Sequence, residues 1–297
     1  MIDPRILISL LATLLLTPLA ASASVPVKSA VVISSPEAHK PTVERWTRAV
    51  AEKGLESVSY VFPWAKDRLH SNGHRDVILM IPDSAAPDDI TLVIWLHGLQ
   101  GFSERTFRAR VLPQISKLVK EKCSLAVAIV EMPWSINTRT PRGRQGKVFQ
   151  QKGHMTGLID DLMDRMTSHF ATRGESRLMG LLRIAVVGHS AGGSALMSAS
   201  ESGDLCEIAP DNVIWSDASY GPWLKRAWSG CLAHAKGTKT EIFVHKGGTP
   251  HKRALQFQNL VGEQPNVEIQ VLPRKGWSHR LIGDSVLRLS KIFPLGC

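Results

Sequence analysis

Residues 183–197 read RIAVVGHSAGGSALM and pass directly from an apolar segment to a run of small residues. Residues 183–187 have the β-branched, apolar composition of a buried strand, and residues 191–197 have the small side chains of a closely packed helix. Between them Ser190 lies in a Gly-x-Ser-x-Gly pattern, which is typical of a tight turn that exposes a serine hydroxyl. This pattern also occurs by chance, so the rest of the chain decides whether Ser190 is a nucleophile or an ordinary turn residue.

Apolar, β-branched segments recur along the chain and predict eight strands. They are residues 57–62, 76–82, 91–98, 125–133, 183–190, 212–219, 241–246 and 267–273. Several are apolar at successive positions, as strands covered on both faces are, and the closeness of the first two favours an antiparallel start. Helical patterns alternate with the later strands, at residues 110–122, 157–170, 191–200, 251–262 and 281–293. This alternation predicts an α/β fold with a mostly parallel sheet and helices on both of its faces.

With the serine pattern placed after the fifth strand, residues 24–297 resemble the α/β-hydrolases, and among them secreted serine esterases and polyester depolymerases. The resemblance implies an eight-stranded α/β-hydrolase fold in which residues 188–192 form the nucleophile elbow. The glycines of the elbow let the backbone turn sharply from strand to helix. Ser190 would then lie at a helix N-terminus, where the helix dipole favours developing negative charge.

The same resemblance implies a histidine base and a carboxylate partner. A serine hydroxyl is a poor nucleophile without a base, and the family supplies a histidine in the loop after the last strand, where this chain has His279. The family's acid most often follows the seventh strand, but residues 242–254 contain no carboxylate. Asp217, at the end of the sixth strand, occupies a position that some hydrolases use instead. It could also be an Asx-turn or helix-capping residue.

An oxyanion hole is expected from two backbone amides. Residues 92–102, LVIWLHGLQGF, resemble the His-Gly segment after the third strand of secreted esterases. The resemblance implies that the N–H groups of Leu99 and Ala191 bind the developing oxyanion, and each such donor is worth about 3 to 4 kcal/mol in the transition state. His97 is expected to be structural. The order Ser190, Asp217, His279 along the chain is that of the family.

A basic loop insertion is expected at about residues 133–153. Its basic residues, with no acidic residue among them, are Arg139, Arg142, Arg144, Lys147 and Lys152. The loop is either a solvated segment or a partial lid that presents Arg139 and Arg142 to an anionic substrate group. Trp134, Trp223 and Trp277 could line a substrate pocket, although core packing explains each of them equally well.

The start of the chain and its cysteines indicate export. Arg5 precedes the apolar run of residues 6–16, and a small-x-small pattern ends at Ala23, which predicts a signal peptide over residues 1–23. The run is shorter than a membrane-spanning helix needs, so no stable membrane anchor is expected after cleavage. In an exported chain the four cysteines suggest disulfides, for which three connectivities are possible. Cys206 with Cys231 is the preferred pair, because both flank one predicted strand.

The charge and motifs of the chain argue against a nucleic-acid-binding protein and against a metal-dependent one. A net charge of +10 favours anionic surroundings, but no nucleic-acid-binding motif is visible. No cofactor is implied, and His70 and His74 have ligand-like spacing without a third ligand, so no metal site is expected.

The sequence therefore predicts an exported, periplasmic or secreted, serine hydrolase that cleaves a small-molecule or polymeric carboxylic ester through an acyl-enzyme intermediate. Two alternatives stay open. One is a peptidase or amidase that acts on an anionic envelope substrate such as a peptidoglycan stem peptide, and the other is an inactive binding protein with the same fold.

Overall fold

A computed structural model describes residues 55–60, 77–82, 85, 89–98, 106–130, 145–174 and 182–292. The expected signal peptide, residues 1–23, lies outside these ranges, as do residues 131–144 of the expected basic loop. Within the described part of the chain, no helix has the length and apolar composition needed to cross a membrane.

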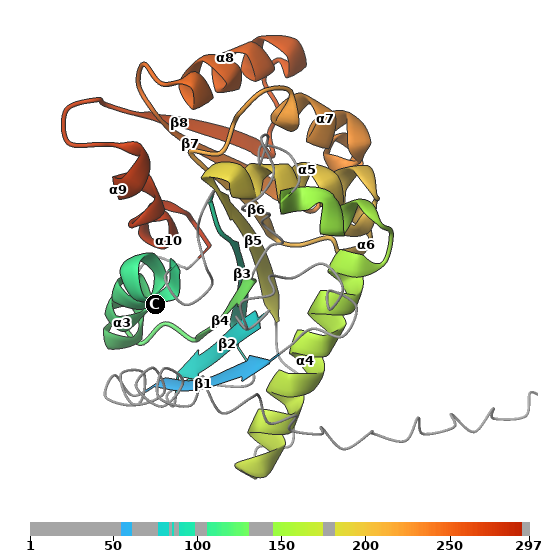
Figure 1. Ribbon diagram of the computed structural model, residues 1–297, viewed down its shortest axis with the longest axis vertical. Coiled ribbons are helices and arrows are strands. Elements are labelled where there is room, and N and C mark those ends of the chain that lie inside the picture. Colours follow the sequence, from blue (N-terminus) through green and yellow to red (C-terminus); the bar gives the residue numbers. More distant parts are fainter. Residues whose placement is uncertain are drawn as a thin grey trace, which may run out of the picture. The chain divides into compact units, whose positions relative to one another are not determined.

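One eight-stranded sheet organises the described residues (Figure 1). Its strands are β1 (Leu55–Tyr60), β2 (Val77–Pro82), β3 (Thr91–Leu96), β4 (Leu125–Val130), β5 (Arg183–His189), β6 (Asn212–Ser216), β7 (Lys239–His245) and β8 (Val267–Leu272). They are arranged in the order β1-β2-β4-β3-β5-β6-β7-β8. Strand β2 pairs antiparallel with both β1 and β4, and all other pairs are parallel. The predicted α/β-hydrolase fold and its antiparallel start are confirmed.

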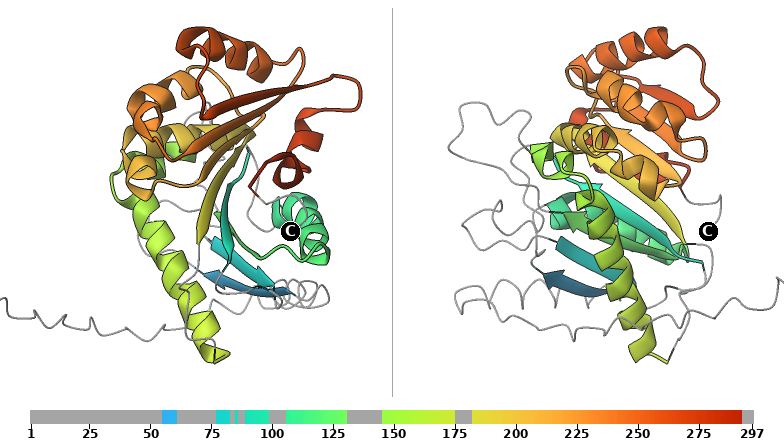
Figure 2. Two further views of the ribbon diagram at one scale, coloured as in Figure 1. Left: turned by 180° about the vertical axis from the view of Figure 1, so that it is seen from behind. Right: turned by 90° about the vertical axis from the view of Figure 1, so that its right-hand side faces the viewer.

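Helices cover both faces of the sheet (Figure 2). They are α3 (Leu112–Lys120), α4 (His154–Thr172), α5 (Gly193–Glu201), α6 (Asp204–Ile208), α7 (Trp223–Gly230), α8 (Thr249–Val261), α9 (His279–Gly283) and α10 (Val286–Leu289). Alternate residues of β3 enter separate cores: Leu92 and Ile94 pack in the core with α4, α5, α7 and α8, whereas Val93 packs in the core with α3, α9 and α10. This division follows from the two-residue period of a strand and accounts for strands that are apolar at successive positions.

The described structure differs from the predicted elements in several places. The single helix expected over residues 281–293 is two short helices, α9 and α10, separated by Asp284 and Ser285. Helices α6 and α7 were not anticipated. Residues 145–150, placed in the basic loop by the sequence, form a 3₁₀ helix, η4, in which Val148 and Phe149 are buried. Their apolar side chains pack in the same core as α4 and α5, which draws this segment into the fold.

Asp204 is a buried carboxylate that joins α6 to the start of α4. Its two oxygens accept hydrogen bonds from the backbone N–H groups of Gly153 and Met155, each at 2.8 Å. The side chain is fully buried, so these bonds replace the water that its charge would otherwise require. Asp204 therefore acts as a long-range cap for the N-terminus of α4.

The preferred disulfide, Cys206 with Cys231, is confirmed. The two cysteines lie in α6 and at the end of α7, on either side of β6, so the bond joins two helices and not the two loops expected from the sequence. No described cysteine has a free thiol.

Replacing both Cys206 and Cys231 by serine is expected to lower the free energy of unfolding by about 3 to 4 kcal/mol. The two cysteines are 25 positions apart, and without the bond the unfolded chain between them regains its conformational entropy. Urea unfolding of the oxidised wild type and of the double variant measures the difference. Equal unfolding midpoints and slopes for the two proteins would show that this bond does not stabilise the fold.

Candidate active site

Ser190 follows β5 directly and begins the short 3₁₀ helix η5 (Ser190–Gly192), which continues into α5. Its φ of +55° lies in the left-handed region, which side chains other than glycine rarely adopt. Such strain costs on the order of 1 to 3 kcal/mol and persists where the surrounding structure holds it in place. The turn leaves Ser190 partly exposed, although the strand before it and the helix after it are buried.

The glycines around Ser190 are required by close packing and not by their own backbone angles. Gly192 has a φ of −58°, yet a Cβ there would collide with the carbonyl oxygen of Leu96 at the end of β3. A Cβ on Gly188 would lie 2.9 Å from the Gly192 oxygen. A Cβ on Gly98 would lie 2.9 Å from the Cβ of Ser190. The turn around Ser190 therefore leaves no room for a side chain larger than hydrogen at these three positions.

Asp217 follows β6, the strand next to β5, and also has a left-handed backbone with a φ of +47°. Its side chain is fully buried, and its Oδ2 accepts hydrogen bonds from Nδ1 of His279 at 2.7 Å and from Nδ1 of His245 at 3.0 Å. The backbone N–H of His245 lies 3.3 Å from Oδ1. Because an ionised carboxylate only accepts hydrogen bonds, both imidazoles carry a proton on Nδ1. This tautomer leaves Nε2 of neutral His279 available as a base.

His279 is the first residue of α9, and two aromatic rings contact its imidazole. The ring of His189 stacks on it with centroids 4.8 Å apart and planes inclined at 26°. The ring of Tyr220 lies edge-on at 6.4 Å. His189 immediately precedes Ser190 in the chain, so this stacking brings His279 to the elbow.

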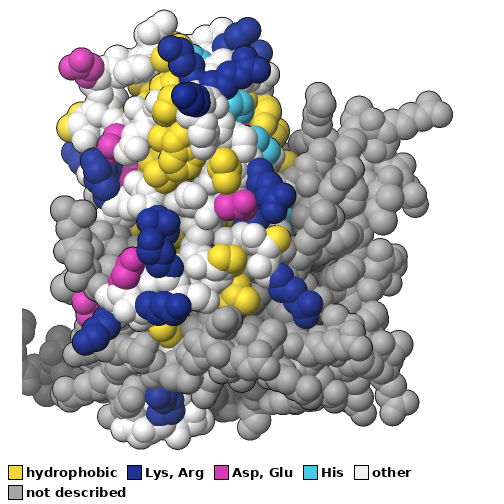
Figure 3. All heavy atoms as spheres, turned by 90° about the vertical axis from the view of Figure 1, so that its left-hand side faces the viewer, with side chains coloured by type: hydrophobic (Ala, Val, Ile, Leu, Met, Phe, Trp, Pro, Cys, Tyr) yellow, Lys and Arg dark blue, Asp and Glu magenta, His cyan; other side chains and the backbone are white. Residues whose placement is uncertain are grey.

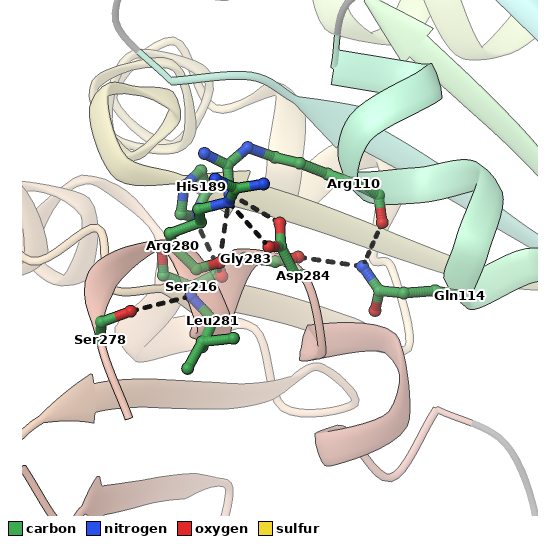
Figure 4. Close-up of polar contacts among 9 residues, drawn as sticks. All are labelled: Arg110, Gln114, His189, Ser216, Ser278, Arg280, Leu281, Gly283 and Asp284. Atoms are coloured by element: carbon green, nitrogen blue, oxygen red, sulfur yellow. Dashed lines mark hydrogen bonds and ion pairs between the residues drawn. The ribbon is translucent and has the colours of Figure 1, made fainter. Parts of the chain in front are cut away.

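Helix α9 is anchored to α3, which lies in the same helical layer (Figure 4). Arg110, just before α3, donates to the carbonyl of Arg280 at 3.1 Å and to the carboxylate of Asp284 at 2.8 Å. Gln114 of α3 donates to the carbonyl of Gly283 at 2.9 Å. The Ser278 hydroxyl caps the helix by accepting from the N–H of Leu281 at 3.3 Å. These contacts fix the short helix that carries His279, which would be unstable in isolation.

His189 is a buried, neutral imidazole under the site. Burial lowers its pKa well below 6.5, and the nearby His279 and Arg110 lower it further. Its Nδ1 lies 3.0 Å from the carbonyl oxygen of Ser216 and donates to it. The ring also packs so closely against Gly283 that a Cβ there would lie 2.6 Å from Cε1. His189 thus provides a rigid, uncharged surface for His279.

The remaining predicted site residues fall into two groups. The first group lies outside the described residues: Leu99, Trp134, Arg139 and Arg142. The second group is described: Ala191 lies in η5 directly after Ser190, Trp223 begins α7 with its ring 5.8 Å from that of Tyr220, and Trp277 is half-buried against the core that contains α3. Of the two tryptophans, Trp223 is linked to the site through Tyr220, whose ring contacts His279.

His245 was not anticipated as a site residue. The catalytic base was expected in the loop after the last strand, and His245 lies instead at the end of β7. One signal could have identified it. The carboxyl ends of adjacent parallel strands meet at one edge of a sheet, so a polar residue at the end of β7 is a natural neighbour for Asp217 at the end of β6.

Basic side chains are more numerous than acidic ones on one described side of the molecule (Figure 3). Figure 3 views the side of the molecule that carries α9 and α3, and Lys and Arg side chains are spread over its described part with few acidic ones among them. This agrees with the net charge of +10 for the whole chain. Among the described residues, no group of three His, Cys, Asp or Glu side chains is arranged to hold a metal ion.

Comparisons with known proteins relate the chain to ester hydrolases. Residues 70–275, more than half of the chain, match the model of a protein family described as "Putative esterase". No curated protein sequence matches the chain.

Solved structures resemble the chain only distantly. The poly(3-hydroxybutyrate) depolymerase LpqC of Bordetella parapertussis has 13% sequence identity and a TM-score of 0.49, over 80% of this chain and 88% of that one. The esterase LipW of Mycobacterium marinum has 15% identity and a TM-score of 0.39, over 86% of this chain and 89% of that one. At this level of identity these structures resemble the chain in fold alone.

A methyl group at position 98 is expected to disturb Ser190. In Gly98→Ala the new Cβ would lie 2.9 Å from the Cβ of Ser190 and 3.4 Å from its Oγ, and overpacking of this kind costs about 1 to 3 kcal/mol. We expect about a tenfold slower reaction of Ser190 with a fluorophosphonate. Gly237→Ala, where a Cβ meets nothing within 4 Å, is the matched control. Equal rates for both variants and the wild type would contradict this packing.

The buried His189 is expected to make stability depend on pH. Because its pKa in the folded protein lies below 6.5, the unfolded chain binds the proton more readily, and stability is lost as the pH falls below about 6.5. His189→Asn keeps a donor near the Ser216 carbonyl but does not titrate. Thermal unfolding between pH 7.5 and 5, a range chosen around the ordinary histidine pKa of about 6.5, should show a smaller loss for the variant. Identical pH dependence of the two proteins would argue against a buried neutral His189.

Proposed function

The chain belongs to the esterase family and is a serine hydrolase of carboxylic esters, and from this premise we propose that Ser190, His279 and Asp217 form its catalytic triad. One observation carries the proposal. The fully buried carboxylate of Asp217 accepts a 2.7 Å hydrogen bond from His279, and the His279 ring stacks on the residue before the strained Ser190. Strained backbone at two of the three positions supports a functional site, since strain of this kind clusters at such sites.

In the acylation step Oγ of Ser190 attacks the ester carbonyl carbon, and Nε2 of His279 accepts the hydroxyl proton. Asp217 remains ionised, holds Nδ1 of His279 and stabilises the imidazolium that forms. When the tetrahedral intermediate collapses, the C–O bond to the alcohol breaks. His279 then returns its proton to the leaving alcohol, and Ser190 carries the acyl group.

Deacylation repeats these roles with water. Nε2 of His279 accepts a proton from water, whose oxygen attacks the acyl carbon, and the bond to Oγ of Ser190 breaks. The proton passes to Oγ, the carboxylic acid leaves, and the serine is restored.

Two backbone N–H groups are proposed to hold the oxyanion. Ala191 follows Ser190 at the start of a helical segment, where N–H groups point out of the helix and the dipole favours negative charge. Leu99 is the proposed second donor, as the family resemblance implies. Gly98, directly before it, lies against Ser190, which supports the assignment of the second donor to this segment.

Export and a preference for anionic substrates complete the proposal. The disulfide between Cys206 and Cys231 supports an oxidising compartment, in agreement with the signal peptide expected at residues 1–23. The net charge of +10 and the expected basic loop with Arg139 and Arg142 support a substrate that carries a negative group. Trp223 is the proposed apolar contact for the substrate.

Reaction with a fluorophosphonate probe tests the triad without a choice of substrate. The wild type should be labelled at Ser190 and Ser190→Ala should not. Asp217→Asn should be labelled about 10⁴-fold more slowly, because an amide no longer enforces the tautomer with Nε2 unprotonated. A folded wild type that is neither labelled nor hydrolyses a small neutral ester would contradict the proposal. Turnover of anionic peptides alone would instead support the amidase alternative.

A further inference from the structure

We propose that His245 is a positioning residue of the active site, which holds the carboxylate of Asp217 in the orientation that serves His279. This inference rests on the proposed catalytic roles of Asp217 and His279. In this arrangement one carboxylate oxygen binds two imidazoles. One imidazole exchanges protons with the reacting groups, and the other keeps the carboxylate in place.

The sheet brings His245 to Asp217. Strands β6 and β7 are parallel neighbours, with Ser216 paired to Phe243. The backbone N–H of Asp217 donates to the carbonyl of Phe243 at 2.7 Å, so the pairing continues one residue beyond β6. Asp217 comes directly after Ser216, and His245 lies two residues after Phe243 on the adjacent strand. Their side chains therefore meet at the carboxyl edge of the sheet.

Both ends of the Asp217 carboxylate contact His245. Oδ2 accepts from the imidazole Nδ1 at 3.0 Å, and Oδ1 lies 3.3 Å from the backbone N–H of the same residue. The second contact is long for a hydrogen bond to a carboxylate. The imidazole of His245 is therefore the stronger of the two restraints that come from β7.

Because the Asp217 carboxylate is buried, the hydrogen bond from His245 matters for its orientation. The Asp217 side chain is fully buried, while the His245 and His279 side chains are 23% and 37% exposed. A buried carboxylate needs a donor for each of its main acceptor sites, and loss of one donor leaves charge without compensation. Without the imidazole of His245, Asp217 could rotate toward water and present a different oxygen to His279.

Gly248 provides the space that His245 occupies. A Cβ on Gly248 would lie 2.7 Å from Cε1 and 2.8 Å from Nε2 of the His245 ring. Gly248 has a φ of −78°, a value that alanine adopts readily, so its backbone angles do not require glycine. The contact with the ring is what a side chain at this position would disturb.

Substitutions at position 245 separate positioning from general stability. His245→Ala removes the imidazole donor, and His245→Asn places an amide N–H near the position of Nδ1. We expect kcat for a small neutral ester to fall about tenfold in His245→Ala, with KM changed by less than about twofold. His245→Asn should recover most of this loss. Thermal unfolding of every variant shows whether it is folded, and His234→Ala, at an exposed histidine, is the matched control.

A double-mutant cycle tests whether His245 acts through Asp217. In an Asp217→Asn background, His245→Ala should cause little further loss, since the carboxylate that it positions is already absent. Gly248→Ala provides an independent perturbation, because it displaces the ring of an intact His245. We expect its kcat to fall by several-fold, whereas Gly237→Ala should resemble the wild type.

Three results would overturn the inference: wild-type kcat in folded His245→Ala, an equal loss from His245→Ala in the Asp217→Asn background, or no recovery in folded His245→Asn. The activity of the other variants then separates this failure from failure of the proposed function. If the wild type is active and Asp217→Asn is impaired while His245→Ala is unaffected, the triad stands and His245 has no positioning role. If the wild type neither hydrolyses esters nor reacts with the probe, both proposals fail.

Discussion

A carboxylate without access to water sets the geometry at the carboxyl edge of this sheet. Asp217 is fully buried, so its charge depends on hydrogen bonds from the protein. Those bonds come from β7 and α9, through His245 and His279. Asp204, the other fully buried aspartate described above, is satisfied by two backbone N–H groups and serves the fold alone. The difference lies in the donors: backbone amides are fixed, whereas an imidazole can accept and return a proton at its second nitrogen.

Close packing holds the nucleophile in its strained conformation. Ser190 keeps a left-handed backbone because β3 and the start of α5 approach so closely that side chains on Gly98 and Gly192 would collide with their neighbours. The base is restrained from the opposite layer, where Arg110 and Gln114 hold α9. The two cores, one on each face of the sheet, therefore meet at one site. One core supports the turn that carries Ser190, and the other supports the helix that carries His279. This arrangement is the preorganisation that catalysis by a positioned base requires.

Much of the fold and part of the site follow from the sequence. Several of the strands were predictable because residues buried on both faces must be apolar at successive positions, as in residues 91–96 and 125–130. The elbow at Ser190 was predictable because its glycines, strand and helix are adjacent in the chain. The final helix was predicted wrongly, since Asp284 and Ser285 interrupt it. Asp284 also binds Arg110, which lies 174 positions away in the chain, and a contact of this range leaves no local pattern in the sequence.

The sequence by itself determined the order of the elements and the position of the turn at Ser190, since both are visible in short-range patterns of apolar and small residues. Tertiary structure alone decided which side chains share the carboxylate of Asp217. His245 and His279 lie 28 and 62 positions from Asp217 in the chain, and only the pairing of β6 with β7 and the docking of α9 bring them together. Hydrogen bonds of this kind require alignment to within a few tenths of an ångström, and that alignment arises from the packing of the whole sheet and both of its helical layers.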